Sequence, residues 1–528
     1  MIFVVGSGPA GVACASALLD AGEKVTMLDA GLLLEPSRRT QVASLQSMPS
    51  TSWPEKSVAF LRDGGDATRD GIPMKPAYGS DFAYRDPIGQ GITSDGAYGM
   101  PSFARGGFSN VWGASVLPYR SEDMSDWPIT ASDLAPHYRA VLGMMPFAGR
   151  HDGLEEQFPL YHDDPGTLGC SSQAEALLRD LELHASQLSA RGVRFGASRL
   201  AVQAEGAGGK PGCVHCGMCL YGCPYEFIYN SAHTMDKLRD NAAFTYHSGV
   251  VVERLEEVSS QVEVTGRNLD GAATFQMRAD KVFVACGVMS TARILLSSLG
   301  AFGQPIHALD NCYFLLPLMR YRSRPAALRE RLHTLAQAFM EIADPAIGPH
   351  RAHLQVYTYN ELLREEMARM MGPLRGALPM IQRSVLGRLL LVQGYLHSDQ
   401  SARIQIVLKP GDDGTSPSLH LTGEPNPQTR RALAAVSRRL WAERGSLKAV
   451  PISPMLRVGQ PGRGFHTGGT FPMRANPGPF EVDVLGRPHG FTRVHVVDAS
   501  VFPSLPATTI TLSVMANAHR IGTAATAP

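Results

Sequence analysis

Residues 2–20 read IFVVGSGPAGVACASALLD, and this stretch decides the fold. The apolar residues Ile2–Val5 have the character of a buried parallel strand, and Val12–Asp20 has that of a helix. Three glycines spaced as G-x-G-x-x-G lie between the two segments. A strand, a glycine turn and a helix in this order predict the first unit of a Rossmann-type α/β domain.

Each glycine of the turn has its own steric role. Gly6 permits the tight bend, Gly8 lets the backbone approach a pyrophosphate, and Gly11 lets the helix pack closely on the strand. A second predicted strand, residues 23–28, ends at Asp29, whose carboxylate can accept hydrogen bonds from the ribose of an adenosine. These residues predict a dinucleotide site, although the fingerprint alone does not separate FAD from NAD.

The composition excludes several classes of protein. A chain of 528 residues is too long for one compact core, so we expect two domains that share an interface. A formal net charge of +1, with 18% charged residues, offers no basic field for a nucleic-acid partner. No apolar run is long enough to predict a transmembrane segment, and the first such run is a strand of the fold. We therefore expect a cytoplasmic protein.

Four of the eight cysteines crowd into one short loop, at Cys213, Cys216, Cys219 and Cys223, directly before Pro224. This C-x-x-C-x-x-C-x-x-x-C-P spacing is the one that bacterial ferredoxins use to bind iron-sulfur clusters. Structural zinc sites usually separate two C-x-x-C pairs by a long loop, which this spacing lacks. Free thiols here would be prone to oxidation. The loop therefore favours an iron-sulfur cluster over zinc.

Two segments between these motifs also carry information. Residues 36–100 are rich in Gly, Pro, Ser and Asp, and their weak periodicity predicts an extended segment lying over the domain. Residues 105–113 form a second glycine loop, in which Gly106 and Gly107 suit close approach of the backbone to a flat ligand. An ordinary turn is the alternative interpretation of that loop.

The middle of the chain contains further strands and a second strand-turn-helix unit. Residues 250–264 alternate as strands do, and the apolar strand 281–285 leads through Gly287 into a predicted helix over 290–298. Beyond residue 311 the pattern changes to amphipathic helices such as 360–371, followed by predicted strands. We expect most of a second domain there.

Near the C-terminus, His466 stands in the sequence FHTGGT, and the strand-like residues 494–498 end in Asp498 before Ala499. Together with the N-terminal fingerprint, the loop at Gly106 and the turn at Gly287, these segments resemble the glucose-methanol-choline (GMC) oxidoreductase family, in the same order along the whole chain. The resemblance implies an α/β fold in which an FAD-binding Rossmann-type domain accompanies a discontinuous α+β substrate-binding domain.

The resemblance also implies where the domains divide. The FAD-binding domain is expected to comprise residues 1–118, 213–310 and 455–528, with the iron-sulfur loop at 213–224. The substrate-binding domain is expected to comprise the remaining residues, 119–212 and 311–454.

In the family, the histidine at the place of His466 faces the flavin as catalytic base or hydrogen-bonding partner. An imidazole suits this role because its pKa near neutrality lets it take the hydroxyl proton as hydride leaves the alcohol carbon. The family's second polar residue, Asn or His, falls at Thr509 here, and a hydroxyl can hold the substrate oxygen but cannot act as a base. A shifted register would give this place to Thr508 or Asn517.

The expected cofactor is FAD, held noncovalently because Val111 stands where some relatives carry a histidine bound to the flavin. The expected cofactor-binding residues are Gly6, Gly8, Gly11, Asp29, Gly106, Gly107, Ser109, Asn110, Val251, Gly287, Asp498 and Ala499. The loop around Trp112 resembles that of pyranose oxidases and bacterial FAD sugar dehydrogenases, which implies a sugar or polyol substrate that is oxidised to a carbonyl.

Some of these dehydrogenases bind a 3Fe-4S cluster through three cysteines spaced as Cys213, Cys219 and Cys223 are. Cys216 is additional and could complete a 4Fe-4S cluster, so the cluster type stays open. A cluster could pass electrons singly from reduced flavin to a cytochrome or quinone, or it could only brace its loop.

Relatives of this kind can be exported with a small accessory subunit, so a periplasmic location is the alternative to the cytoplasm. An oxygen-using oxidase, a non-redox FAD-containing lyase and a non-catalytic redox sensor are the alternative functions.

Overall fold

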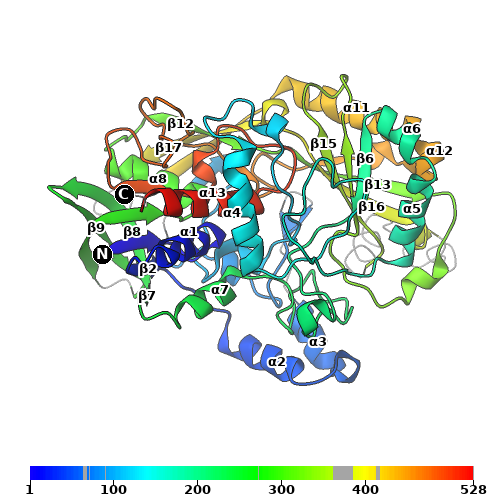
Figure 1. The fold of residues 1–528 in the computed structure, drawn as a ribbon, viewed down its shortest axis with the longest axis horizontal. Coiled ribbons are helices and arrows are strands. Elements are labelled where there is room, and N and C mark those ends of the chain that lie inside the picture. The colour runs from blue at the N-terminus through cyan, green and yellow to red at the C-terminus, as the bar shows by residue number, and fades with distance from the viewer. Residues whose placement is uncertain are drawn as a thin grey trace.

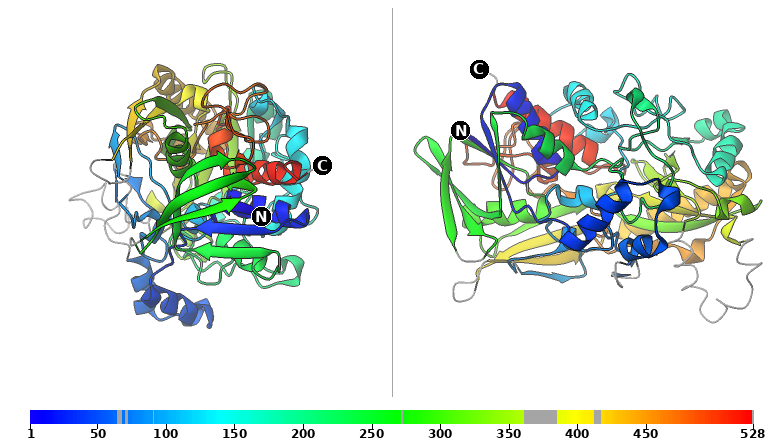
Figure 2. Two further views of the ribbon diagram at one scale, coloured as in Figure 1. Left: turned by 90° about the vertical axis from the view of Figure 1, so that its left-hand side faces the viewer. Right: turned by 90° about the horizontal axis from the view of Figure 1, so that it is seen from below.

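The computed structural model describes residues 1–526 except 64–67, 70–71, 90, 271–272, 361–384 and 412–416. The helix predicted over residues 360–371 falls outside the described residues, apart from Asn360. The chain forms two halves along its longest axis, and both termini lie at the same end of the molecule (Figures 1 and 2). Within the described residues, no helix combines the length and the apolar character needed to cross a membrane.

A five-stranded parallel sheet organises the half that contains the termini. Its strands lie in the order β22-β11-β1-β2-β7, and every neighbouring pair is parallel. Their bounds are β1 Ile2–Val5, β2 Val25–Asp29, β7 Phe244–Ser248, β11 Lys281–Val284 and β22 Val494–Val496. The two strands predicted on either side of the glycine turn, and the strand predicted over 281–285, are thus confirmed.

Alternate side chains of β1 pack on opposite faces of this sheet. Ile2 and Val4 join a core with helices α1 (Pro9–Asp20) and α13 (Thr511–Ala524), which contact each other. Phe3 and Val5 join a second core with the antiparallel strands β8 (Val250–Val258), β9 (Gln261–Asn268) and β10 (Thr274–Ala279). The sheet is therefore buried on both faces, which explains the continuous apolar run of β1.

A second sheet of five strands covers helix α8 (Val288–Ser298), which also contacts β8. The strand order is β21-β12-β17-β18-β5. Their bounds are β5 Ile92–Asp95, β12 Pro305–Asp310, β17 Arg403–Lys409, β18 Ser418–Glu424 and β21 Thr467–Gly468. Strands β17 and β18, taken above as part of the substrate-binding domain, therefore pack on the nucleotide-binding half. The division of the chain into domains stays a prediction.

The other half is built on a large antiparallel sheet with the order β19-β13-β16-β15-β14-β6, in which β20 also pairs with β13. Its strands are β6 Val193–Ala197, β13 Tyr313–Arg320, β14 Ala338–Ile342, β15 Ala352–Tyr357, β16 Leu389–Tyr395, β19 Ala449–Pro451 and β20 Arg457–Val458. One face is apolar and packs on α5 (Ser172–Glu182) and α11 (Pro427–Ala442), at the right of Figure 1. The opposite face is turned toward the other half.

Four further helices complete the fold, together with α6 (Ala185–Ala190), α12 (Arg444–Leu447) and the short strands β3 (Thr68–Arg69) and β4 (Ile72–Pro73). These helices are α2 (Pro36–Gln46), α3 (Glu55–Arg62), α4 (Ala131–Met144) and α7 (Ser231–Leu238). The prediction of an extended segment over residues 36–100 is therefore wrong for the residues of α2 and α3. Each of α2 and α3 buries a single residue, Leu45 and Leu61, so their sequences carry little helical periodicity.

Gly11 provides a test of the packing between α1 and β1. A Cβ at this position would stand 1.9 Å from the carbonyl oxygen of Gly6, whose backbone cannot yield without opening the turn. Gly11→Ala is therefore expected to lower the free energy of unfolding by about 1–3 kcal/mol, measured by urea denaturation.

Gly143, in the exposed part of α4, is the matched control for this substitution. A Cβ there meets nothing within 4 Å, so Gly143→Ala should leave the protein as stable or more stable by up to about 1 kcal/mol. Equal effects of the two substitutions would contradict the packing argument.

Candidate active site

A cavity of about 230 Å³ lies over the carboxyl ends of the parallel strands β1, β2 and β11. In a parallel α/β sheet this is the edge at which ligands bind. The cavity is lined by the turn after β1, the end of β2, residues 98–104, the start of β8 and the turn after β11. Residues 498–499 and 510–511, near the C-terminus, close its far end. Segments distant in the sequence thus converge on one site.

The turn after β1 exposes backbone to this cavity. Gly6 adopts a φ of +101°, and a Cβ there would stand 2.6 Å from the carbonyl oxygen of Ala285. A Cβ on Gly8 would meet no atom within 4 Å, so this position opens into the cavity. Gly8 also precedes the first turn of α1, which no side chain among the described residues caps. The N–H groups of that turn are therefore available to a phosphate.

Asp29 stands at the other edge of the same turn. Its carboxylate accepts hydrogen bonds from the Ser7 hydroxyl at 2.5 Å and from the Tyr246 hydroxyl at 2.8 Å. Burial raises the pKa of Asp29 to about 6, although these hydrogen bonds act in the opposite direction. Both hydroxyls approach Oδ2, and Oδ1 accepts only the Ser7 N–H at 3.4 Å, so a lone pair of Oδ1 is left for a ribose hydroxyl at the cavity wall.

The second glycine loop contributes less to this cavity than its motif predicts. Gly107 lies in the lining, whereas Gly106, Ser109 and Asn110 do not. The Ser109 hydroxyl bonds to the carbonyl of Gly106, and the Asn110 amide bonds to the carbonyls of Arg105 and Gly107. These two side chains therefore stabilise the loop from within, and their assignment to the cofactor stays a prediction.

Asp498 joins the C-terminal segment to the start of α8. Its carboxylate accepts hydrogen bonds from the Gly287 N–H at 2.9 Å, the Thr291 hydroxyl at 2.5 Å and the Ser500 N–H at 2.9 Å. Burial raises the pKa of Asp498, and the hydrogen bonds oppose this shift. Asp498, Ala499, Gly287 and Val251 all line the cavity, whereas Gly11 serves the packing of α1, and their assignment to the cofactor stays a prediction.

His466 lies between the two halves of the molecule. Its neighbours Phe465 and Thr467 line the cavity, and its ring stacks on Tyr395, the last residue of β16, with 4.6 Å between ring centroids. Burial lowers the pKa of His466 to about 4, with a further contribution from nearby His353. Its buried Nδ1 has no hydrogen-bond partner among the described residues. His466 is therefore a neutral imidazole at neutral pH and can accept a proton.

Asn311 positions this histidine, and the sequence analysis did not find it. Its backbone N–H donates to the carbonyl of His466 at 3.3 Å, and its side-chain amide donates to the carbonyl of Pro506 at 2.6 Å. Asn311 thus holds the histidine segment beside the loop that carries Thr508 and Thr509. No motif marks an isolated Asn after a strand, so only the pairing of β12 with β21 reveals its role.

The two threonines of this loop differ in their partners. The Thr509 hydroxyl accepts the backbone N–H of Leu117 at 2.9 Å, whereas the buried hydroxyl of Thr508 has no partner among the described residues. Asn517, the third candidate, lies within α13, where its side-chain oxygen accepts two hydrogen bonds from Arg520. Thr508 is therefore the better placed of the three to offer an unused polar group.

The antiparallel sheet presents a row of polar and aromatic side chains on the same side as His466. Tyr313, Tyr395, His353 and Glu341 are direct cross-strand neighbours on β13, β16, β15 and β14. Gln393 and Gln355 follow in the next row. Sequence analysis missed these residues, because strands with both faces buried do not show the simple alternation of apolar and polar positions.

All four cysteines of the predicted cluster loop line one further cavity, which is very small. Burial raises the pKa of the Cys213 and Cys223 thiols to about 12, and that of Cys216 to about 11, with repulsion from Cys219 adding to each shift. Lys75 lies close to this site, since Cys219 and Cys223 both act on its ammonium charge. Its ammonium group also donates to the carbonyl of Trp112 at 2.5 Å, which connects the cysteine cavity to the second glycine loop.

Comparison with known proteins agrees with this geometry. Residues 407–518 match the family model described as GMC oxidoreductase. The chain is 24% identical over 543 residues to paromamine 6'-oxidase of Streptomyces fradiae, an alignment that covers 98% of this chain and 90% of that protein. The crystal structure of pyridoxine 4-oxidase from Mesorbium loti superposes with a TM-score of 0.59, covering 99% of this chain and 98% of that chain at 16% identity.

The cavity at the glycine turn, with a neutral imidazole beside it, suits a flavin-dependent oxidoreductase. Over residues 407–518 the chain is similar to the GMC oxidoreductases, a family of FAD-dependent enzymes that act on CH–OH groups. The fold class predicted from the sequence, an FAD-binding Rossmann-type domain with a substrate-binding domain, is confirmed.

Substitution of the two threonines tests their different environments. Thr509→Val leaves the buried N–H of Leu117 without its acceptor and should lower the free energy of unfolding by about 1–3 kcal/mol. Thr508→Val removes a hydroxyl that has no partner to lose, so the folded state should be as stable as the parent. Thermal denaturation of the FAD-loaded proteins measures both, and a larger loss for Thr508→Val would contradict the assignment.

Proposed function

We propose that this protein oxidises an alcohol group of a sugar or polyol to a carbonyl, with His466 as the base that takes the hydroxyl proton. The observation that carries the proposal is a neutral imidazole, partly buried and with a buried Nδ1, at the junction between the cavity and the polar face of the antiparallel sheet. A neutral imidazole can receive a proton without first losing one. FAD supplies the hydride acceptor when it is bound.

The residues around the cavity at the glycine turn fit FAD. The uncapped first turn of α1 and the open backbone at Gly8 suit the pyrophosphate, and Asp29 suits the ribose of the adenosine. Val251 lies at the same end, whereas Asp498 and Ala499 lie beside the turn at Gly287 and suit the flavin half. Val111 cannot form a bond to the flavin, so we propose noncovalent binding.

The polar face of the antiparallel sheet supports a polyhydroxylated substrate. Tyr395 stacks on His466, the Gln393 amide donates to the Tyr395 hydroxyl at 2.5 Å, and Tyr357 donates to Gln355 at 3.3 Å. Hydroxyls and amides both donate and accept hydrogen bonds, as sugar hydroxyls require. Paromamine 6'-oxidase, the similar protein reported above, is named for the oxidation of paromamine.

We also propose that the four-cysteine loop holds an iron-sulfur cluster. All four thiols line one cavity, which supports a shared ligand. Tetrahedral zinc with bonds of about 2.3 Å would hold its sulfurs about 3.8 Å apart. Within the described residues, any three of these sulfurs include at least one pair more than 4.8 Å apart. A cluster interposes its own iron and sulfide atoms and so tolerates the wider spacing.

A cluster would supply one-electron transfer, which suits an external acceptor such as a cytochrome or a quinone. The contact of Lys75 with Trp112 places the cysteine cavity next to the loop that borders the FAD site. The second candidate is an oxidase that reduces oxygen, because both relatives reported above are named as oxidases. Oxygen consumption, compared with dye reduction under anaerobic conditions, separates the two functions.

Replacement of His466 tests the proposed base. His466→Ala should slow reduction of the bound flavin by sugars under anaerobic conditions by about 10²–10⁴-fold, with the FAD content unchanged. Burial lowers the pKa of His466 to about 4, below the ordinary histidine value of 6.5. The parent should therefore keep its rate of flavin reduction at a pH one unit below 6.5. It should lose that rate only near pH 4, where the imidazole becomes protonated.

His489, an exposed histidine, is the control, and His489→Ala should match the parent. A parent whose flavin no sugar or polyol bleaches, or a His466→Ala variant as fast as the parent, would exclude the proposed mechanism.

The cysteine loop is tested by metal content. Protein purified without oxygen should contain iron and acid-labile sulfide, and Cys223→Ser should lose most of both while it retains FAD. Cys170→Ser is the control, because Cys170 lies outside the cysteine cavity. Zinc in place of iron in the parent, or unchanged iron in Cys223→Ser, would show that these thiols hold no cluster.

A further inference from the structure

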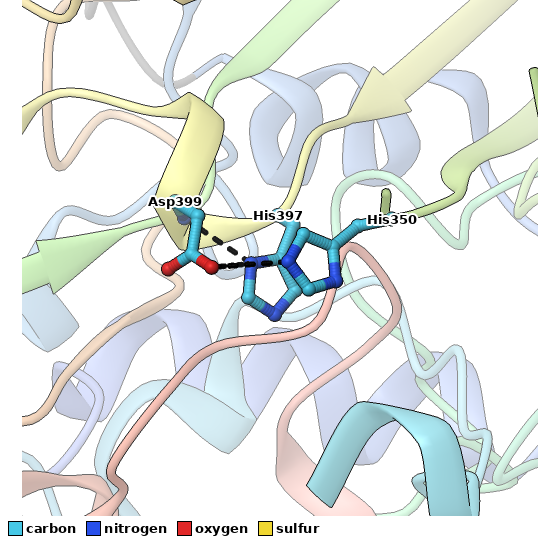
Figure 3. A group of neighbouring side chains, drawn as sticks. All are labelled: His350, His397 and Asp399. Atoms are coloured by element: carbon cyan, nitrogen blue, oxygen red, sulfur yellow. Dashed lines mark hydrogen bonds and ion pairs between the residues drawn. The ribbon is translucent and has the colours of Figure 1, made fainter. Parts of the chain in front are cut away.

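Three ligand-type side chains meet away from the active site, at the ends of two neighbouring strands. His350 lies just before β15, and His397 lies just after β16, its antiparallel partner. Asp399 follows in the single 3₁₀ turn of residues 398–400. Figure 3 shows the two imidazole rings face to face, with the carboxylate of Asp399 turned toward a nitrogen of each.

The ligand atoms lie close enough together for one metal ion. The two rings stack with 3.5 Å between their centroids and 8° between their planes, so one imidazole must turn about its side-chain bonds before both in-plane lone pairs point at the same ion. Asp399 Oδ2 lies 3.0 Å from His350 Nε2 and 3.7 Å from His397 Nδ1. Bonds of about 2.0–2.1 Å to a tetrahedral zinc ion would place its ligand atoms about 3.3 Å apart. In the part of the chain that the structure describes, no other three His, Cys, Asp or Glu side chains bring their ligand atoms within 4.8 Å of one another.

The scaffold beneath these side chains is held by many hydrogen bonds. The Gln400 amide donates to the carbonyl of Ile347, which connects the two ligand-bearing segments. The Asn426 amide donates to the carbonyl of Asp399 at 2.9 Å, and the Ser401 hydroxyl donates to the carbonyl of His397 at 2.8 Å. The backbone that carries the ligands is therefore ordered before an ion binds, so binding requires an imidazole to turn but no loop to become ordered.

The protonation state and the exposure of the group also suit a cation. The Asp399 N–H donates to His397 Nδ1 at 3.1 Å, so this nitrogen carries its lone pair rather than a proton. Asp399 is 60% exposed, so an ion can enter from solvent, and water can complete its coordination.

We propose that His350 Nε2, His397 Nδ1 and Asp399 Oδ2 bind a divalent transition-metal ion such as Zn²⁺. Two imidazoles and one carboxylate are ligands that such ions accept in proteins. The ion takes the lone pair that His397 now shares with the Asp399 amide. It ties the adjacent ends of β15 and β16 together.

The site is also coupled to the loop of Thr508 and Thr509. Ser398 donates its N–H to the carbonyl of Leu505 at 2.9 Å and accepts the Leu505 N–H at its hydroxyl at 3.0 Å. A bound ion therefore stabilises the segment that carries these threonines. The metal is structural and stands apart from both the FAD cavity and the cysteine loop.

Calorimetric titration of untagged, FAD-loaded protein with Zn²⁺ tests the site. The parent is expected to bind one equivalent of Zn²⁺. Asp399→Asn and His350→Gln should bind this ion at least about 100-fold more weakly, because a change even outside the ligand set weakens metal sites by about 10–100-fold. The matched control is His151→Gln, because His151 pairs with Glu155 on the surface without a third ligand. The control should bind as the parent does.

The absorption spectrum of bound Co²⁺ distinguishes an ion at this site from metal held by the cysteines. Co²⁺ at the His350, His397 and Asp399 site should give ligand-field bands without thiolate charge transfer, and these bands should vanish in Asp399→Asn. Asp399 is exposed, so this variant is expected to fold, and equal melting temperatures without metal would verify it. A parent that binds no ion beyond the cysteine loop, or a folded Asp399→Asn that binds as tightly as the parent, overturns the proposal.

Discussion

The close packing of α1 on the end of β1 is the constraint on which the rest of the structure depends. With hydrogen alone on the Cα of Gly11, the helix approaches the carbonyl of Gly6, and Gly6 itself lies against the carbonyl of Ala285. These contacts aim the uncapped first turn of α1 at the cavity and place Ser7 within hydrogen-bonding distance of Asp29. A larger residue in the turn would separate the strand, the helix and the site together.

A second constraint joins the halves of the molecule at His466. The segment of this histidine pairs as β21 with β12, Asn311 links it to Pro506, and its ring stacks on Tyr395 of the other half. Burial between the two halves is the main cause of the low pKa of His466. The same assembly that orients the imidazole therefore also keeps it neutral, so position and protonation state have one physical origin.

Much of the nucleotide-binding half could be predicted, because its signals are local. The glycine turn, the acid at the end of β2 and the strand-turn-helix unit at Gly287 each lie within a short stretch of sequence. The prediction was wrong for α2 and α3, each of which has a single fully buried residue. Ser109 and Asn110 belong to the predicted loop, yet their side chains bond within it, and no motif specifies the direction of a side chain.

The sequence by itself determined the class of fold and the identity of the chemical groups: the glycine turn, the imidazole and the clustered thiols. Only the tertiary structure decided which polar residues face His466 and which cysteines share a cavity. It also brought His350 next to His397, through the pairing of β15 with β16. The physical reason is that glycine turns and ligand spacings depend on neighbours in the chain, whereas burial, pKa and convergence depend on contacts between residues far apart in sequence.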